Sequence, residues 1–147
     1  MLKIITCILI ICISTYIGYS YSNKYIKIND FYKGFYDFNL LIKNKISFSK
    51  ETLNTIIKNL DDKNIFNEII KTEKTPKFLC EEDIKEFKNY IEKLGKSDSD
   101  SQIDILKSYD SILDNKVKEA EKNKDKYKTV FIKIGFLIGL IISVAII

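Results

Sequence analysis

The 147-residue sequence contains no histidine, no arginine and no tryptophan. Without histidine there is no imidazole for a Ser-His-Asp triad, a zinc site or proton transfer near neutral pH. Without arginine no guanidinium can contact guanine or phosphate through two parallel hydrogen bonds, so the net charge of +4 is weak support for nucleic-acid binding. We therefore predict that the protein binds no nucleic acid.

Glycine and cysteine are also scarce. The five glycines are scattered, which excludes a glycine-rich phosphate-binding loop. Cys7 and Cys12 lie in an apolar segment and Cys80 is the one cysteine in the polar region, so a disulfide framework is not expected there. The sequence predicts no catalytic residue, no metal site and no cofactor, and a protein that is not an enzyme.

The N-terminus is apolar. No charged residue occurs between Ile4 and Tyr21, a stretch that as a helix spans most of a bilayer core of about 30 Å. Residues 1–22 are therefore predicted to be a transmembrane helix. The alternative is a cleaved signal peptide, with Lys3 as its basic start and a cleavage site near Ser20–Ser22.

The C-terminus is the stronger membrane signal. The sequence IGFLIGLIISVAII, residues 134–147, carries no charged side chain. Together with the four residues before it, this stretch reaches about 27 Å as a helix, and Lys133 can extend its amino group to the lipid headgroups. Residues 130–147 are predicted to be a second transmembrane helix.

Lysines flank both apolar segments on the side of the central region, residues 23–129. Lysine-rich flanks stay in the cytoplasm, so this region is predicted to be a cytosolic domain with both chain ends across the membrane. The run before the second segment could also contact anionic lipid or an acidic partner, although topology alone would explain it. The lysines of this run are Lys116, Lys118, Lys122, Lys124, Lys126 and Lys128.

Both apolar segments carry small residues at every fourth position, namely Ser14 and Gly18 in the first and Gly135, Gly139 and Ser143 in the second. This spacing places small side chains on one helix face, where two backbones can approach closely. We predict that these faces pack helix against helix.

The central region shows helical periodicity and no strand-like alternation, so the fold class is predicted to be all-α. One helix continues out of the first membrane segment, and a second begins with Ser49 as its N-cap. A third begins at Asp61 or Asp62, and a fourth runs from Glu81 to a cap at Gly95. A last helix begins near residue 99 and runs continuously into the membrane.

The stretch LGKSDSDSQ, residues 94–102, joins the last two helices. It fails as an EF-hand loop, because Ile103 stands where glycine is required. Ser99 and Gln102 instead fit a capping box, so a helix–helix turn is predicted. A carboxylate or metal-dependent enzyme using Asp98, Asp100 and Asp104 is the remaining catalytic alternative.

This pattern resembles the stage III sporulation protein AB family. The family has a Leu-Gly pair, an Asp three residues after the Gly and a Gln four beyond, which correspond here to Leu94, Gly95, Asp98 and Gln102. Its Gly-Phe-Leu-x-Gly-Leu membrane segment corresponds to residues 135–140. Residues 45–49, KISFS, depart from the Glu-Ile-x-Tyr-Gly that the family usually shows.

The resemblance implies a non-catalytic scaffold, similar to the cytoplasmic domain of the type II secretion platform protein, in the channel-like apparatus between mother cell and forespore. The protein would lie in the outer forespore membrane, with its domain facing the mother-cell cytosol. Its implied partners are the membrane, other stage III sporulation proteins including a secretion-type ATPase, and further copies of itself in a homo-oligomer. The alternative function is an extracytoplasmic binding or adhesive domain with a cleaved signal peptide and a C-terminal membrane anchor.

Overall fold

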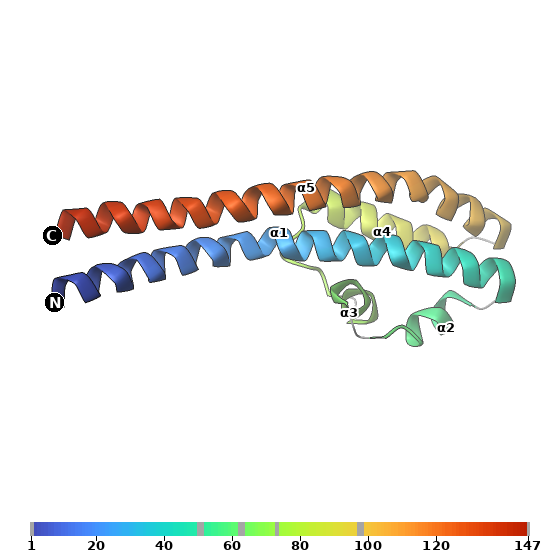
Figure 1. Cartoon of the computed structure of the whole chain (residues 1–147). Helices are drawn as coiled ribbons and strands as arrows, with labels where there is room; N and C mark the ends of the chain where they lie inside the picture. Colours follow the sequence, from blue (N-terminus) through green and yellow to red (C-terminus); the bar gives the residue numbers. More distant parts are fainter. Residues whose placement is uncertain (1, 50–51, 62–63, 73, 97–98, 147) are drawn as a thin grey trace. The chain divides into compact units, whose positions relative to one another are not determined.

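The computed structural model describes residues 2–49, 52–61, 64–72, 74–96 and 99–146. These residues form five α-helices and no strand: α1 (Leu2–Ser49), α2 (Leu53–Lys58), α3 (Ile65–Thr72), α4 (Glu81–Lys96) and α5 (Ser99–Ile146) (Figure 1). The all-α class predicted from the periodicity is therefore confirmed. As predicted, the last helix continues without a break from the turn before it into the apolar C-terminal segment.

The chain divides into two compact units. The first contains residues 1–26 and 120–147, and the second contains residues 27–119. Helices α1 and α5 each contribute one part to each unit.

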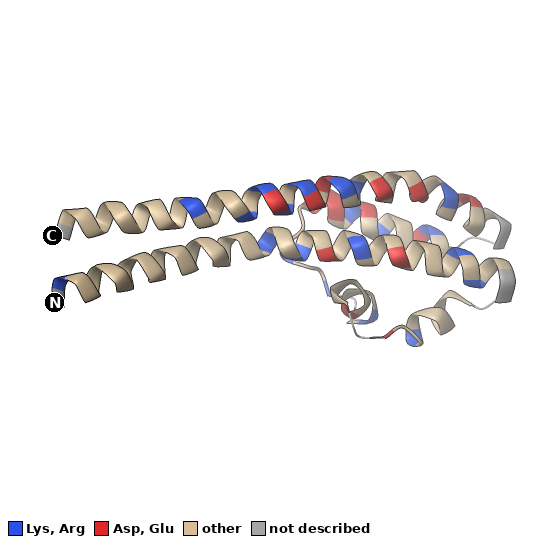
Figure 2. Ribbon diagram, in the orientation of Figure 1, with Lys and Arg blue, Asp and Glu red and all other residues tan. Residues whose placement is uncertain are grey.

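The first unit is an antiparallel pair formed by the start of α1 and the end of α5, which lie side by side with the two chain ends together (Figure 1). Large apolar side chains cover its outside, such as Ile8 at 56% exposure and Val144 at 73%. Charged residues are nearly absent toward the two ends, as Figure 2 shows. By length and composition both helices could cross a membrane.

The second unit is built around aromatic rings from α1, α3 and α4. Phe35 and Phe66 stack with their centroids 5.2 Å apart, and Tyr90 meets Phe35 edge to face at 4.8 Å. Helix α3 approaches α1 closely because Gly34 has no side chain: a Cβ there would lie 2.5 Å from Cβ of Phe66. Burial of each such ring stabilises the fold by about 1.5–3 kcal/mol.

Two helix starts differ from the predicted ones. Ser49 ends α1 rather than capping α2, whose N-cap is Thr52, with its side chain accepting from the backbone N–H of Thr55. Helix α3 begins at Ile65, where Oδ1 of Asn64 accepts from the N–H of Asn67 at 2.8 Å. Several residues near both starts have cap-forming side chains, and periodicity alone does not choose among them. Helix α4 begins at Glu81, as predicted.

Candidate functional site

The central polar feature of the second unit is the side chain of Asn39 on α1, which is completely buried. Its Nδ2 donates to Oδ1 of Asp110 at 2.7 Å and to the carbonyl oxygen of Leu106 at 3.1 Å, both on α5. Its Oδ1 accepts from the hydroxyl of Tyr90 on α4 at 2.8 Å. One amide therefore joins three helices, with both donors and the acceptor satisfied.

Desolvation and neighbouring charge keep the Tyr90 hydroxyl of this network protonated. Burial raises the pKa of Tyr90 far above its usual value, and the neighbouring Tyr109 and Asp110 add to the increase. The hydroxyl therefore stays protonated and donates. Lys43 forms an ion pair with Oδ2 of Asp110, so the carboxylate is neutralised on its other oxygen. We call Lys43, Asn39, Tyr90 and Asp110 the Asn39 network.

A second polar cluster joins α5 to the start of α4. Nζ of Lys116 lies 2.8 Å from Oδ1 of Asp83 and 3.7 Å from Oε2 of Glu86. The same ammonium group lies 5.6 Å from the centre of the Tyr32 ring, within the range of a cation–π contact. The Cys80 thiol donates to Oδ2 of Asp83 at 3.0 Å.

These contacts shift the pKa values of the cluster in opposite directions. Partial burial acts to raise the pKa of Asp83, but hydrogen bonds from Lys116, Cys80 and Tyr32 lower it below its usual value. Burial acts to lower the pKa of Lys116, and the hydrogen bond and charge of Asp83 raise it. Burial and then Asp83 raise the pKa of Tyr32. The cluster is an ion pair at neutral pH.

The turn predicted between α4 and α5 has its own hydrogen bond. Nε2 of Gln102 donates to the carbonyl oxygen of Leu94 at 2.6 Å, and the Leu94 side chain is fully buried. Gly95 lies inside α4, which ends at Lys96, one residue beyond the predicted cap. Asp98 and the side chain of Asp100 lie outside the residues that the structure describes. Asp104 is exposed and pairs with Lys107 at 3.7 Å.

The small residues of the two apolar segments lie where α1 and α5 meet in the first unit. A Cβ at Gly18 would lie 2.3 Å from the carbonyl oxygen of Phe131, one at Gly135 2.5 Å from that of Ser14, and one at Gly139 2.8 Å from Cα of Ile11. Any larger residue at these three positions would therefore push the backbones apart.

Toward the chain ends, Ser143 and Cys7 make the polar contact of the same pair. The Ser143 hydroxyl lies 2.8 Å from the carbonyl oxygen of Gly139 and 3.3 Å from that of Cys7. The Cys7 thiol in turn donates to the carbonyl oxygen of Ser143 at 3.8 Å. In apolar surroundings such contacts satisfy polar groups that have no water to bind.

The lysines of the predicted contact run differ in their surroundings. Lys116 pairs with Asp83, and Lys118 pairs with Asp114 at 2.6 Å one helical turn away. Lys124 is half-buried and lies 3.5 Å from Asp125. The remaining three are exposed: Lys122, Lys126 and Lys128. Contact of this run with anionic lipid or an acidic partner stays a prediction.

The Asn39 network was not predicted from the sequence. Asn39 lies on the same face as Phe35 and Ile42, so a polar residue interrupts an apolar stripe, and Asp110 interrupts the stripe of α5 in the same way. These two interruptions are the feature of the sequence that could have indicated the network, because buried polar groups need hydrogen-bond partners. Among the described residues no group of three or more His, Cys, Asp or Glu could hold a metal ion.

Comparison with known proteins adds one match. A family model described as Stage III sporulation protein AB matches residues 61–147, from the residues before α3 to the end of the chain. Neither the curated proteins nor the solved structures contain a match.

Proposed function

The chain belongs to the stage III sporulation protein AB family, and from this premise we propose that it is a membrane-anchored, non-catalytic scaffold of the apparatus that connects mother cell and forespore. The family gives the protein a role in sporulation. The observation that carries the finer proposal is the extent of the match, which includes α4 with Asp83 and all of α5 with Lys116 and its apolar end.

The composition of the first unit supports a membrane anchor. Its outer surface consists of large apolar side chains, which in water would form an exposed patch far beyond that of ordinary soluble proteins. The exposed lysines 122, 126 and 128 lie on the side of this unit away from the chain ends. The positive-inside rule then places the second unit in the cytosol. The family resemblance implies the outer forespore membrane as the location, with the mother cell as the compartment that holds this unit.

The polar clusters of the second unit support a scaffold rather than an enzyme. Asn39 and Tyr90 are buried, the hydrogen-bonding groups of the Asn39 network bind one another, and Asp83 pairs with Lys116. Such networks define how helices pack. The proposed partners are other stage III proteins, including a secretion-type ATPase, and further copies of the chain.

Deletion of the gene in the endospore-forming host tests the role. We expect forespores that complete engulfment and then stop, and a loss of heat-resistant spores that a wild-type copy restores. Normal numbers of heat-resistant spores would refute the proposal. Co-purification of the secretion-type ATPase with the tagged full-length chain tests the partner separately.

Orientation is tested with Cys80, which is exposed. A membrane-impermeant maleimide should label Cys80 only after the mother cell is permeabilised, and a Cys80→Ser variant should remain unlabelled. Labelling of intact cells would place the second unit outside. That result would favour the extracytoplasmic adhesive domain with a cleaved signal peptide.

A further inference from the structure

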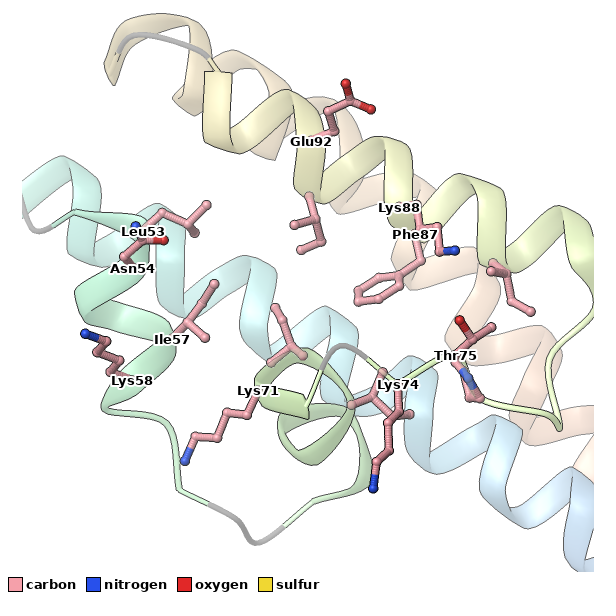
Figure 3. A pocket seen from close by; sticks show the side chains of 15 residues that line it. Leu53, Asn54, Ile57, Lys58, Lys71, Lys74, Thr75, Phe87, Lys88 and Glu92 are labelled. Carbon is pink, nitrogen blue, oxygen red and sulfur yellow. The ribbon is translucent and has the colours of Figure 1, made fainter.

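Helices α2, α3 and α4 border an open groove of about 710 Å³ in the second unit. Figure 3 shows Ile57 of α2 and Phe87 of α4 pointing into it. The apolar side chains that α2 and α4 contribute are only half-buried, so the isolated chain leaves them partly in contact with water. The half-buried apolar side chains are Leu53, Ile57, Ile84, Phe87 and Ile91.

The charges around this groove are mostly positive. Its lining contains four lysines and one glutamate, Glu92, a net charge of +3. Lys58, Lys74 and Lys88 are exposed, while Lys71 is half-buried and donates to the carbonyl oxygen of Leu60. An occupant must therefore be apolar where it meets the walls and negatively charged where it meets the border.

The walls have the spacing of helix faces. Ile84, Phe87 and Ile91 recur at three and four residues along α4 and cover about 10 Å. Leu53 and Ile57 lie one turn apart on α2 and form the opposite wall. Two helical walls with apolar residues at these intervals accept the apolar stripe of a third helix.

We propose that this groove binds an amphipathic helix of a partner protein, in which aspartate and glutamate border the apolar stripe. The apolar stripe contacts α2 and α4, and the carboxylates pair with Lys58, Lys74 and Lys88. The lysines give selectivity for an acidic helix and speed its association, while the apolar walls supply most of the affinity. This inference rests on the proposed function in one respect, that the domain acts by binding other proteins.

The test uses the full-length chain in nanodiscs of zwitterionic lipid. The probe is a fluorescent helical peptide with leucine at every third and fourth position and glutamate beside the leucines, and its anisotropy is the readout. A matched peptide with lysine in place of glutamate is the charge control, and empty nanodiscs are the lipid control. We expect the acidic peptide to bind at least about tenfold more tightly than the basic one, with an affinity that falls as salt rises.

Variants assign the binding to the groove. Lys58→Glu, Lys74→Glu and Lys88→Glu combined should weaken binding of the acidic peptide about tenfold or more. The matched control is Lys85→Glu, because Lys85 is an exposed lysine on α4 that does not line the groove. Ile57→Ser tests the apolar wall and should weaken both peptides. Circular dichroism of each variant checks that the helices are retained.

Three results would overturn the proposal. They are the absence of peptide binding, equal binding of the acidic and basic peptides, and equal effects of Lys85→Glu and the triple variant. Binding of phosphatidylglycerol vesicles through the three lysines, without peptide binding, would assign the groove to lipid instead. Failure of this proposal and failure of the proposed function can be told apart. If no peptide binds but the deletion strain makes no heat-resistant spores, the proposed function stands and only the groove proposal fails. If the peptide binds but the deletion strain sporulates normally, only the proposed function fails.

Discussion

The side-chain amide of Asn39 donates to the carboxylate of Asp110 at 2.7 Å, across 71 residues of sequence. Because Asn39 is completely buried, this bond and the one from Tyr90 define how α1, α4 and α5 face one another. An apolar residue at position 39 could pack in several registers, whereas the amide satisfies its partners in one.

Replacing Asn39 by leucine should destabilise the chain by about 2–4 kcal/mol, because it leaves the buried Tyr90 hydroxyl and one oxygen of Asp110 without their partner. Urea unfolding followed by circular dichroism in detergent measures the change. The control is Asn44→Ala, at an exposed asparagine of the same helix, which should leave stability unchanged.

A double variant separates loss of the hydrogen bonds from a packing defect. Asn39→Leu combined with Tyr90→Phe should be less destabilised than the sum of the two single variants, because the hydroxyl that lost its partner is gone as well. Strict additivity would contradict the coupling that the 2.8 Å bond indicates.

The pair of Asp83 and Lys116 should make stability depend on pH at both extremes. The lowered pKa of Asp83 gives a contribution that is complete above the unfolded pKa of about 3.9 and is lost as pH falls through the folded value. The raised pKa of Lys116 gives a contribution that is complete below about 10.4 and is lost as pH rises through its folded value. The raised pKa of Tyr32 acts in the same direction as that of Lys116.

Asp83→Asn should therefore lower the free energy of unfolding by about 1–3 kcal/mol at pH 7 and flatten its dependence on pH below about 4. Urea unfolding across the pH range measures both effects. Asp114→Asn breaks the exposed pair with Lys118 and should leave the curve unchanged. If the free energy of unfolding fell as steeply with decreasing pH in Asp83→Asn as in the wild type, this assignment would be contradicted.

Ser143→Cys should form a disulfide with Cys7 inside one chain, because the Cys7 thiol already touches the backbone of Ser143. The test uses a chain that also carries Cys12→Ser and Cys80→Ser, so that the cysteines at positions 7 and 143 are the two that remain. Mild oxidation should protect both from a polyethylene-glycol maleimide, and no dimers should form. Val144→Cys is the matched control, since Val144 is 73% exposed and should remain labelled. Disulfide-linked dimers would instead place the contact between chains.

Gly139→Leu should lower the yield of the same disulfide, because even a Cβ at Gly139 would lie 2.8 Å from Cα of Ile11. Ile138→Leu, at an exposed neighbour, should leave the yield unchanged. An unchanged yield in Gly139→Leu would show that close approach at this glycine does not hold the helices together.

Reversing the charge of Lys122, Lys126 and Lys128 should increase the fraction of chains whose Cys80 is labelled in intact cells. Each lysine near an anionic membrane surface favours the cytoplasmic side by about 1 kcal/mol, and glutamate removes that preference. Lys107→Glu, at an exposed lysine near the start of α5 and outside the first unit, is the control. Unchanged labelling would mean that another feature sets the orientation.

Part of the fold could be predicted residue by residue. Glu81 starts α4 because three acidic residues in its first turn suit the positive end of the helix dipole, and that preference is local. The starts of α2 and α3 were wrong by a few residues, because Ser49, Thr52, Asp61 and Asn64 are all good caps. The choice depends on how the short helices pack, since helices of six and eight residues are not stable alone.

The sequence by itself determined the helical class, the two apolar ends and the unbroken last helix, because periodicity and charge distribution act between residues one or two turns apart. Only the tertiary structure decided that Asn39 forms a hydrogen bond with Asp110, that Lys116 forms an ion pair with Asp83 and that lysines border an apolar groove. These pairings depend on which helix faces meet. That choice is made by burying the rings of Phe35, Phe66 and Tyr90 together, and no local pattern specifies it.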